Sequence, residues 1–384
     1  MEKLRVFEAF SGYGSQSMAL RNIGVPYEVV GISEIDKYAI QVYKSIQGEV
    51  NNLGDISKIQ VENIPKHDLF TYSFPCQDIS VAGKMEGIQR GQTRSGLLYE
   101  CERIIEHCKP KYLLMENVKN LVGKKFINQF NQWLDYLKSL GYTNYWQVLN
   151  SKDYGVPQNR ERVFVVSILG EHKPYEFPKR FKLDKNIKSL LEGNVADKYY
   201  LSDEMVKKFV PSKNFTTRTI KPTLKNGIDT NDSSKIIDVG FVKKSENGTK
   251  HQSNTVLDED YLMRTLMASD YKSPQLITIK NKEITHQTIC EQRTDEGLRF
   301  FKDDVCGAIR TANNGGDKRV IETEPSFRIR KVTPRECFRL MGVTDEDIDK
   351  IVNSGVSATQ QYKMAGNSIV IQVLEGIFKN LFLS

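Results

Sequence analysis

Hydrophobic and polar residues follow two alternating periods over roughly the first 170 positions. Short apolar runs that fit strands are separated by segments with the i, i+3, i+4 spacing of amphipathic helices. This alternation is typical of strand–helix–strand units, so it predicts a mostly parallel sheet with helices on both faces. The expected strands are Leu4–Phe10, Val29–Ser33, Asp68–Phe74, Tyr112–Met115, Tyr145–Leu149 and Arg162–Leu169. The expected helices are Ser15–Asn22, Lys37–Ile46, Gly96–Cys108 and Ile127–Leu140.

The pattern weakens after about residue 174 and returns near residue 328. The region between has shorter apolar runs among many Asn, Thr, Ser, Lys and Gly residues, which predicts a smaller, irregular, strand-rich module. Thr333 then fits a helix N-cap followed by proline, and Gln372–Leu381 fits an amphipathic helix. We therefore expect an α/β fold with a Rossmann-like mixed sheet over residues 1–174 and 328–384, interrupted by a second domain at 175–327.

Length and composition agree with two domains of ordinary globular character. The chain has 384 residues, of which 39% are hydrophobic and 27% charged, so a disordered, collagen-like or coiled-coil protein is excluded. Neither a membrane span nor a signal peptide is predicted, which favours a cytoplasmic protein. The net charge is +7, and residues 171–330 hold 29 Lys and Arg against 24 Asp and Glu. This excess permits a polyanionic partner, although a solvated basic surface explains it equally well.

Phe10-Ser-Gly-Tyr-Gly follows the first strand and opens a helix. Gly12 and Gly14 allow a close approach of backbone to a ligand, but the third glycine of a dinucleotide fingerprint is missing. Glu34 stands 20 residues after Gly14, the spacing at which an acid meets ribose hydroxyls, and Asp55 follows at a later turn. The alternative is a tight turn with solvated acids. Together these residues favour a nucleoside ligand that carries a carboxylate and no phosphate, as S-adenosylmethionine does.

The six cysteines show no paired spacing, so neither a disulfide framework nor a zinc site is predicted. Cys101 and Cys108 share one helix face and fit small core residues. Cys76 is different, because Pro75 ends the third strand and presents Cys76 at the carboxyl edge of the sheet. It is either a nucleophile or a buried structural thiol.

Charged residues near the next strand ends favour the nucleophile. Glu116 ends the strand expected beside Cys76, and Arg160 and Arg162 are placed on one face at the start of a strand. Surface ion pairing with Glu161 is the alternative for the two arginines. A thiolate adding to C6 of cytosine, a carboxylic acid at N3 and a guanidinium at O2 would together make C5 nucleophilic toward a methyl donor.

At this point the sequence resembles the C5-cytosine-specific DNA methyltransferases. Six motifs stand in the family's order and spacing: Phe7–Gly14, Ser73–Gln77, Glu116–Val118, Gln158–Arg162, Arg330–Gly342 and Tyr362–Val370. Tyr13 and Met364 depart from the family pattern at positions that we expect to tolerate change.

The resemblance implies a role for each matching residue. The implied catalytic residues are Cys76 as nucleophile, Gln77 beside it, Glu116 at N3, Arg162 at O2 and Arg160 in support. The implied S-adenosylmethionine site consists of Phe10, Gly12, Gly14, Glu34, Asp55, Pro75 and Asn367, with no metal. The glycine-punctuated segment 80–96 would be a lid over a flipped cytosine, with Ser80, Lys84, Arg90 and Arg94 facing DNA; a mobile surface loop is the alternative.

The sequence is compatible with three functions. They are a DNA cytosine-C5 methyltransferase, a tRNA cytosine-C5 methyltransferase of the same fold, and a binding protein without turnover. The intact motifs disfavour the third, and the long 175–327 module favours target recognition in double-stranded DNA over tRNA. The expected protein is a monomer on DNA in a prokaryote or phage, with or without a cognate restriction endonuclease.

Overall fold

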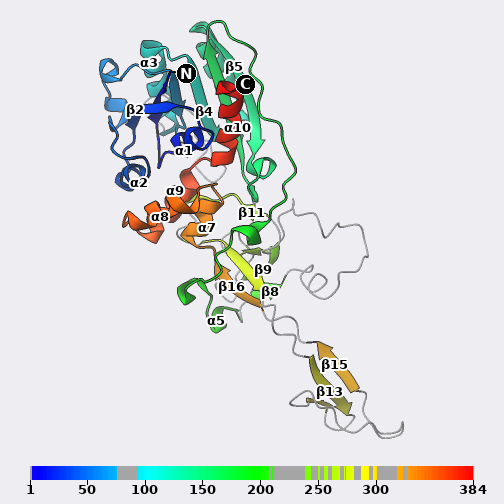
Figure 1. Ribbon diagram of the computed structural model, residues 1–384. Coiled ribbons are helices and arrows are strands. Elements are labelled where there is room, and N and C mark those ends of the chain that lie inside the picture. The colour runs from blue at the N-terminus through cyan, green and yellow to red at the C-terminus, as the bar shows by residue number, and fades with distance from the viewer. Residues whose placement is uncertain are drawn as a thin grey trace.

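The computed structural model of the chain describes residues 2–75, 94–206, 209–211, 238–243, 250, 255–257, 262–268, 272, 274–280, 287–293, 297–300, 318–322 and 327–383. Their central feature is a six-stranded sheet (Figure 1). In spatial order its strands are β2 (Tyr27–Ser33), β1 (Leu4–Ala9), β3 (Leu69–Tyr72), β4 (Tyr112–Val118), β7 (Glu161–Leu169) and β5 (Tyr142–Asn150).

The predicted α/β class is confirmed, and the sheet is mixed. Strands β1 to β4 are mutually parallel, whereas β7 runs antiparallel to both β4 and β5. The chain returns from β5 to β7 through residues 151–160 without a crossover helix of the kind that parallel neighbours need, and this short connection explains the antiparallel strand. The same pairing extends β4 to Val118, three residues past the predicted end.

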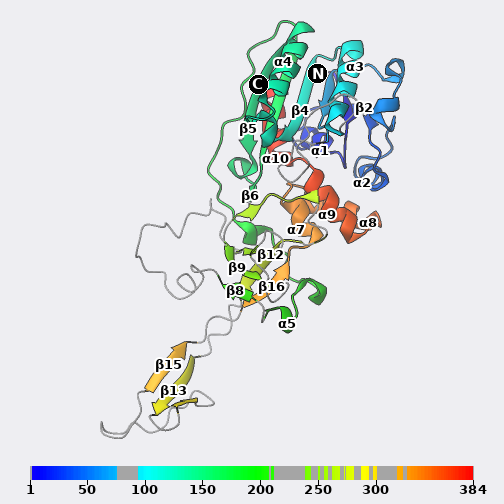
Figure 2. The same ribbon diagram turned by 180° about the vertical axis from the view of Figure 1, so that it is seen from behind.

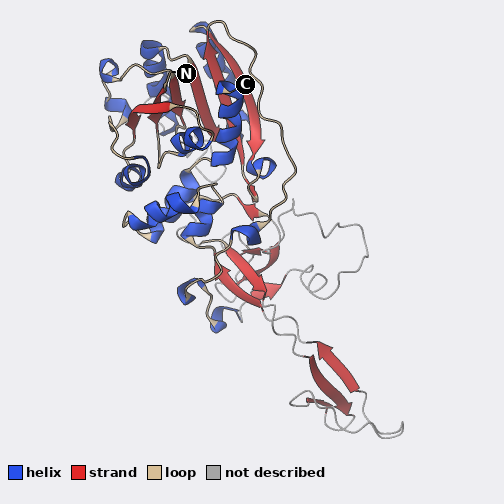
Figure 3. Ribbon diagram, in the orientation of Figure 1, coloured by secondary structure: helices blue, strands red, loops and turns tan. Residues whose placement is uncertain are grey.

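Helices cover both faces of this sheet (Figure 3). Successive strand residues point to opposite faces, so Val6 joins the core cluster with α1 and α10, while Phe7 joins the cluster with α3 and α4. Cys101 and Cys108 both pack in the second cluster, as expected for small core residues. The helices are α1 (Ser15–Asn22), α2 (Lys37–Gln47), α3 (Leu98–Cys108), α4 (Ile127–Ser139), α5 (Asp203–Val206), α7 (Pro334–Arg339), α8 (Asp345–Asn353), α9 (Ala358–Asn367) and α10 (Ile371–Phe382).

The C-terminal helices return to the first part of the chain. Thr333 caps α7 in a capping box with Glu336, as its sequence predicts. Asn22 on α1 donates to Glu375 on α10 at 2.8 Å, so the two ends of the chain lie side by side. Helices α8 and α9 were not predicted.

The remaining strands form smaller sheets below the central one (Figure 2). A five-stranded sheet has the order β16 (Phe327–Lys331), β12 (Leu276–Lys280), β10 (Thr255–Leu257), β9 (Asp238–Val242) and β8 (Phe209–Pro211). A three-stranded sheet has the order β14 (Gly297–Phe300), β13 (Gln287–Arg293) and β15 (Lys318–Glu322). The short strand β11 (Met263–Arg264) pairs instead with β6 (Gln158–Asn159).

Glu8 is a charged residue in the middle of β1, and its side chain is fully buried. Ser17 Oγ donates to one carboxyl oxygen at 2.6 Å and Tyr43 OH to the other at 3.0 Å. Burial raises the pKa of this carboxyl to about 7, although the two hydrogen bonds oppose the rise.

This buried carboxyl predicts a pH dependence of stability. Between about pH 4.5 and 7 the folded protein holds a proton that the unfolded chain releases. The free energy of unfolding should therefore fall as pH rises through this window, by on the order of 3 kcal/mol from this group. Urea denaturation of Glu8→Gln should show that contribution removed, whereas the exposed Glu28→Gln should keep it. An unchanged slope in Glu8→Gln would contradict the prediction.

Candidate active site

The carboxyl ends of the central strands meet around one cavity of about 340 Å³. Parallel register aligns Ala9 with Ser33 and Tyr72, and Tyr72 with Met115, so the residues that follow these strands share one edge. The cavity is lined by residues of the β1, β2, β3 and β4 ends, the start of β7 and the C-terminal end of α9. Among the sequence-predicted residues it brings together Phe10, Gly12, Glu34, Asp55, Pro75, Glu116, Arg160, Arg162 and Asn367.

The glycine turn after β1 has left-handed backbone at three positions. Phe10, Gly12 and Gly14 have φ angles of 55°, 55° and 87°. A Cβ atom at Gly14 would lie 2.8 Å from Cε2 of Tyr43, a fully buried ring. Helix α1 then begins without a side-chain cap, and Ser11 Oγ is buried with no hydrogen-bond partner among the described residues. The turn therefore offers the unpaired Ser11 hydroxyl at the cavity, as a polar ligand requires.

Glu34 and Asp55, the two acids predicted to bind a ribose and an adenine, line the cavity, but both also accept hydrogen bonds from backbone N–H groups. Glu34 accepts hydrogen bonds from the N–H groups of Gly12 at 2.9 Å, Ile35 at 2.8 Å and Asp36 at 2.9 Å. Asp55 accepts from Ser57 N–H at 3.1 Å and from Ser57 Oγ at 2.8 Å, and these bonds lower its pKa. Each carboxylate keeps acceptor capacity for a ligand, since two oxygens offer about four lone-pair positions.

The turn that leads to Cys76 is held from two sides. Asn117 Nδ2 donates to Phe74 O at 3.1 Å, and Ser95 Oγ donates to Pro75 O at 2.7 Å. The predicted residues Cys76, Gln77, Ser80, Lys84 and Arg90 lie outside the described residues, and of Arg94 only the backbone, which begins a 3₁₀ helix, is described.

The buried Glu116 and the partly buried Arg162 form an ion pair at the cavity. Arg162 pairs with Val118 across β4 and β7, and this register puts Glu116 and Arg162 on the same face of the sheet. Arg162 Nε lies 3.1 Å from Glu116 Oε1. Burial raises the pKa of Glu116, whereas Arg162, Arg160 and a hydrogen bond from Ser73 lower it. The net result is a pKa above the ordinary value of a glutamic acid, so Glu116 holds its proton to higher pH than an exposed carboxyl does.

Arg160 differs from its expected place. It precedes β7, so it does not share a strand face with Arg162. The reason is the break between β6 and β7, which turns its 3%-exposed side chain toward three backbone carbonyls. Its guanidinium donates to Leu266 O at 2.8 Å, Gly366 O at 3.1 Å and Ser368 O at 2.7 Å.

Several lining residues were not in the predicted site. Lys363 on α9 lies 2.7 Å from Asp36, and this ion pair joins the last motif to the end of β2. Ile35 lines the cavity with 73% of its surface exposed, an unusual exposure for a large apolar residue. Tyr13 OH donates to Ser368 Oγ at 2.6 Å from a buried ring, which argues against the tolerance expected at this position. For Ile35 and Asp36 the sequence did hold a signal, because both residues directly follow Glu34 at the end of β2 and so lie at the same edge of the sheet.

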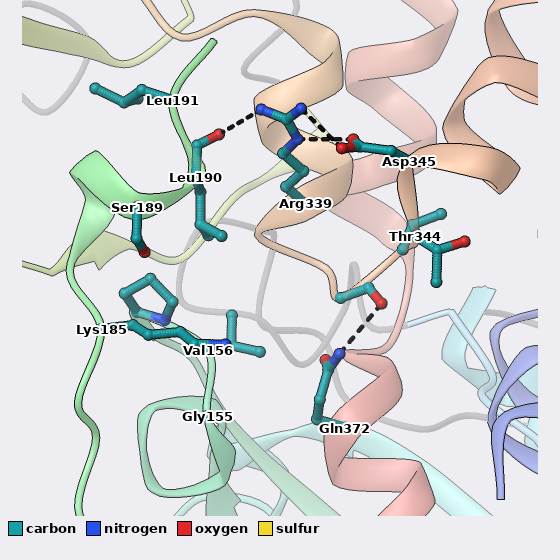
Figure 4. A pocket seen from close by; sticks show the side chains of 13 residues that line it. Gly155, Val156, Lys185, Ser189, Leu190, Leu191, Arg339, Thr344, Asp345 and Gln372 are labelled. Atoms are coloured by element: carbon teal, nitrogen blue, oxygen red, sulfur yellow. Dashed lines mark hydrogen bonds and ion pairs between the residues drawn. The ribbon is translucent and has the colours of Figure 1, made fainter. Parts of the chain in front are cut away.

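A second cavity of about 540 Å³ lies between the β5–β6 connection, residues 185–191 and the end of α7 (Figure 4). Its most prominent charge, Arg339, is already bonded to Leu190 O at 3.0 Å and to both oxygens of Asp345. We therefore place the candidate site in the smaller cavity, where the strands end.

The described ranges contain no group of three or more His, Cys, Asp and Glu residues arranged to hold a metal ion. None of the helices in these ranges is long and apolar enough to cross a membrane.

The mixed sheet, with its cavity at the carboxyl ends of the strands, defines an α/β protein of the class that binds ligands at this edge. Residues 4–383 match the model of the C-5 cytosine-specific DNA methylase family, and the chain belongs to this family. It is therefore a DNA cytosine methyltransferase, which implies S-adenosylmethionine as methyl donor, and the tRNA alternative has less support.

Individual relatives agree with this assignment. The chain is 36% identical to the type II methyltransferase M2.ScrFI of Lactococcus lactis subsp. cremoris, over 99% of each protein. It is 33% identical to the orphan methyltransferase M.SPRI of Bacillus phage SPR, over 99% of this chain and 98% of the relative. Among solved structures, the Entamoeba histolytica methyltransferase EhMeth shares the fold, with a TM-score of 0.66 and 16% identity over 100% of this chain and 98% of that one. The S. pombe Dnmt2 methyltransferase also shares it, with a TM-score of 0.62 and 17% identity over 99% of each chain.

The contact at Gly14 gives a prediction with a matched control. Alanine at Gly14 or at Gly24 (φ +73°) must adopt left-handed backbone, which costs about 1–2 kcal/mol. Only Gly14→Ala also presses on Tyr43, whose ring is buried and bonded to Glu8, at a further cost of about 1–3 kcal/mol. Urea denaturation should show the larger loss in Gly14→Ala, and titration calorimetry should show weaker S-adenosylmethionine binding in that variant alone. Equal losses would argue against the close contact.

Proposed function

We propose that this protein flips a cytosine out of double-stranded DNA and methylates its C5 atom through a covalent bond between Cys76 and C6. The observation that carries the proposal is the ion pair of the buried Glu116 with Arg162, which lies in one cavity with the turn that leads to Cys76. A buried carboxyl paired with a guanidinium matches the N3 and O2 edge of a cytosine.

The proposed reaction begins at Cys76. Its thiolate adds to C6 while Glu116 gives a proton to N3, and Arg162 stabilises the negative charge that develops on O2. The resulting enamine is nucleophilic at C5. When bound, S-adenosylmethionine supplies an electrophilic methyl group. Methylation of C5 leaves S-adenosylhomocysteine as the leaving group. The C5 proton then leaves to a base, the C5–C6 double bond re-forms as the thiolate is released, and N3 returns its proton to Glu116. In this scheme Gln77 assists Cys76 from the next position in the chain. The positive charge of Arg160 acts on the Glu116 carboxyl and lowers its pKa.

The proposed S-adenosylmethionine site is the glycine-turn side of the cavity. Gly12 and Gly14 shape the turn, and the start of α1, which has no side-chain cap, suits a carboxylate. Glu34 is assigned to the ribose and Asp55 to the adenine amino group, with the exposed Ile35 available to cover the base. Phe10, Pro75 and Asn367 complete the proposed wall.

We assign residues 175–327 to target recognition and residues 1–174 and 328–384 to catalysis. The separate sheets and the excess of basic residues in the middle of the chain support a division of this kind, and strand β16 carries the five-stranded sheet four residues past position 327. Segment 80–96, with Ser80, Lys84, Arg90 and Arg94, is proposed to close over the flipped base as a lid. We further propose a monomer on DNA, in the cytoplasm of a prokaryote or a phage-infected cell. The relatives' names, type II and orphan, match function with or without a cognate restriction endonuclease.

Trapping with 5-fluorocytosine tests the nucleophile. Fluorine replaces the C5 hydrogen that a base must remove before the thiolate can leave. The wild-type protein should therefore form a denaturation-resistant adduct with such DNA in the presence of S-adenosylmethionine. Cys76→Ala should form none, Cys108→Ala should behave as wild type, and Glu116→Gln should form the adduct about 10²–10⁴ times more slowly. An adduct that survives in Cys76→Ala would contradict the mechanism. Bisulfite sequencing of a plasmid from an expressing host would give the methylated site.

The basic recognition region predicts salt-sensitive binding. Each phosphate contact releases counterions, so the logarithm of the affinity for duplex DNA should fall linearly with the logarithm of salt concentration, with a slope of roughly −0.9 per contact. Fluorescence anisotropy with a labelled duplex between about 50 and 200 mM salt measures this slope. Affinity that does not change with salt would count against phosphate contacts.

A further inference from the structure

One segment of the middle region leaves its own sheets and packs on the catalytic part. Residues 262–268, here called the strap, run beside β6 through the pairs Met263–Gln158 and Arg264–Asn159 (β11 in Figure 1, β6 in Figure 2). Thr265 Oγ1 donates to Asn159 O at 2.7 Å. Because Leu262, Met263 and Leu266 are at most 2% exposed, the strap is anchored in the core by three of its seven residues.

Two further contacts hold the strap from opposite sides. Gln158 Oε1 accepts a hydrogen bond from Leu266 N–H at 3.2 Å, while its Nε2 donates to Leu340 O at 2.7 Å. On the other side a Cβ atom at Gly366 would lie only 2.2 Å from the carbonyl carbon of Met267. The strap is thus fixed between β6 and α9.

The strap also forms a hydrogen bond with Arg160, which lines the cavity. Leu266 N–H meets Gln158, and Leu266 O accepts from the Arg160 guanidinium at 2.8 Å. Arg160 lines the same cavity as Glu116, and its charge acts on that carboxyl. A long side chain that bonds to fixed carbonyls loses its rotational freedom, so the position of Leu266 O helps to decide where the charge stays.

We propose that the strap is a positioning element, which holds the Arg160 guanidinium beside Glu116 through the Leu266 carbonyl and so links the recognition region to the catalytic cavity. The proposal rests on the catalytic role proposed for Glu116. Thr265 and Gln158 act through Arg160 and do not touch the reacting atoms.

Loss of this support changes the protonation of Glu116 in a defined direction. Among the described residues, the charges that act on Glu116 are Arg162 and Arg160; Ser73 donates a hydrogen bond to it, and the Tyr13 phenol faces Arg160. Both arginines lower the pKa of Glu116 against the effect of burial. If Arg160 moves away, Glu116 keeps its proton to higher pH.

Thr265→Val tests the strap, because it keeps the shape of threonine and removes the bond to Asn159. The single-turnover methylation rate should fall about 3- to 30-fold, because a Glu116 with a higher pKa is a weaker acid and gives its proton to N3 less readily, with little change in KM for DNA. The alkaline limb of its pH profile should move to higher pH, since catalysis needs the protonated Glu116. Thr265→Ser retains the hydroxyl and should restore both. A wild-type pH profile in Thr265→Val would overturn the positioning role, even if that variant were less stable.

Hydrogen exchange of the DNA-free protein gives a second readout that does not depend on methylation. Peptides covering 262–268 should exchange faster in Thr265→Val and in Arg160→Lys than in wild type or Thr265→Ser, because each of the first two loosens the strap. Unchanged exchange in both would overturn the proposal. A wild-type protein that forms no adduct with 5-fluorocytosine DNA would refute the proposed function instead, so the two failures are distinguishable.

Discussion

A buried guanidinium joins three distant parts of this chain. Arg160 is almost inaccessible to solvent, and a buried charge is very costly unless hydrogen bonds compensate it. Backbone carbonyls of Leu266, Gly366 and Ser368 supply those bonds. The chain must therefore bring its middle region and its last motif to the start of β7, and the cavity at the strand ends forms where they meet.

A second buried arginine fixes the junction below it. Arg330 on β16 and Glu336 on α7 are each 1% exposed, and two hydrogen bonds of 2.7 and 2.8 Å join them. Glu336 also completes the capping box of Thr333, so one carboxylate sets both the start of α7 and its contact with the five-stranded sheet. Separation of the two side chains would leave an uncompensated buried charge, which is strongly destabilising. The ion pair therefore holds β16 and α7 together. The two arginines tie the middle region to the part of the chain that forms the central sheet.

The sequence predicted the central fold well because its signals are local. Apolar periodicity located β1, β2, α1, α2 and α4 to within about two residues at most ends. It missed the antiparallel direction of β7, since strand direction depends on the connection and not on the strand. It also missed α9, which carries Gly366 near its end. That glycine is needed because the strap backbone leaves no room for a side chain, a fact that only the packing reveals.

For the candidate site, too, the sequence predicted one part and the tertiary structure decided the other. Its chemistry was readable from the sequence, because acids, arginines and glycines that directly follow strands must gather at one edge of a parallel sheet. The tertiary structure alone decided their partners: Arg162 with Glu116, Lys363 with Asp36, Tyr13 with Ser368 and Arg160 with the strap. Each of these contacts joins residues on different elements, and three of the four span more than 100 positions. Sequence spacing fixes which residues follow which strand, whereas burial and register fix which side chains meet.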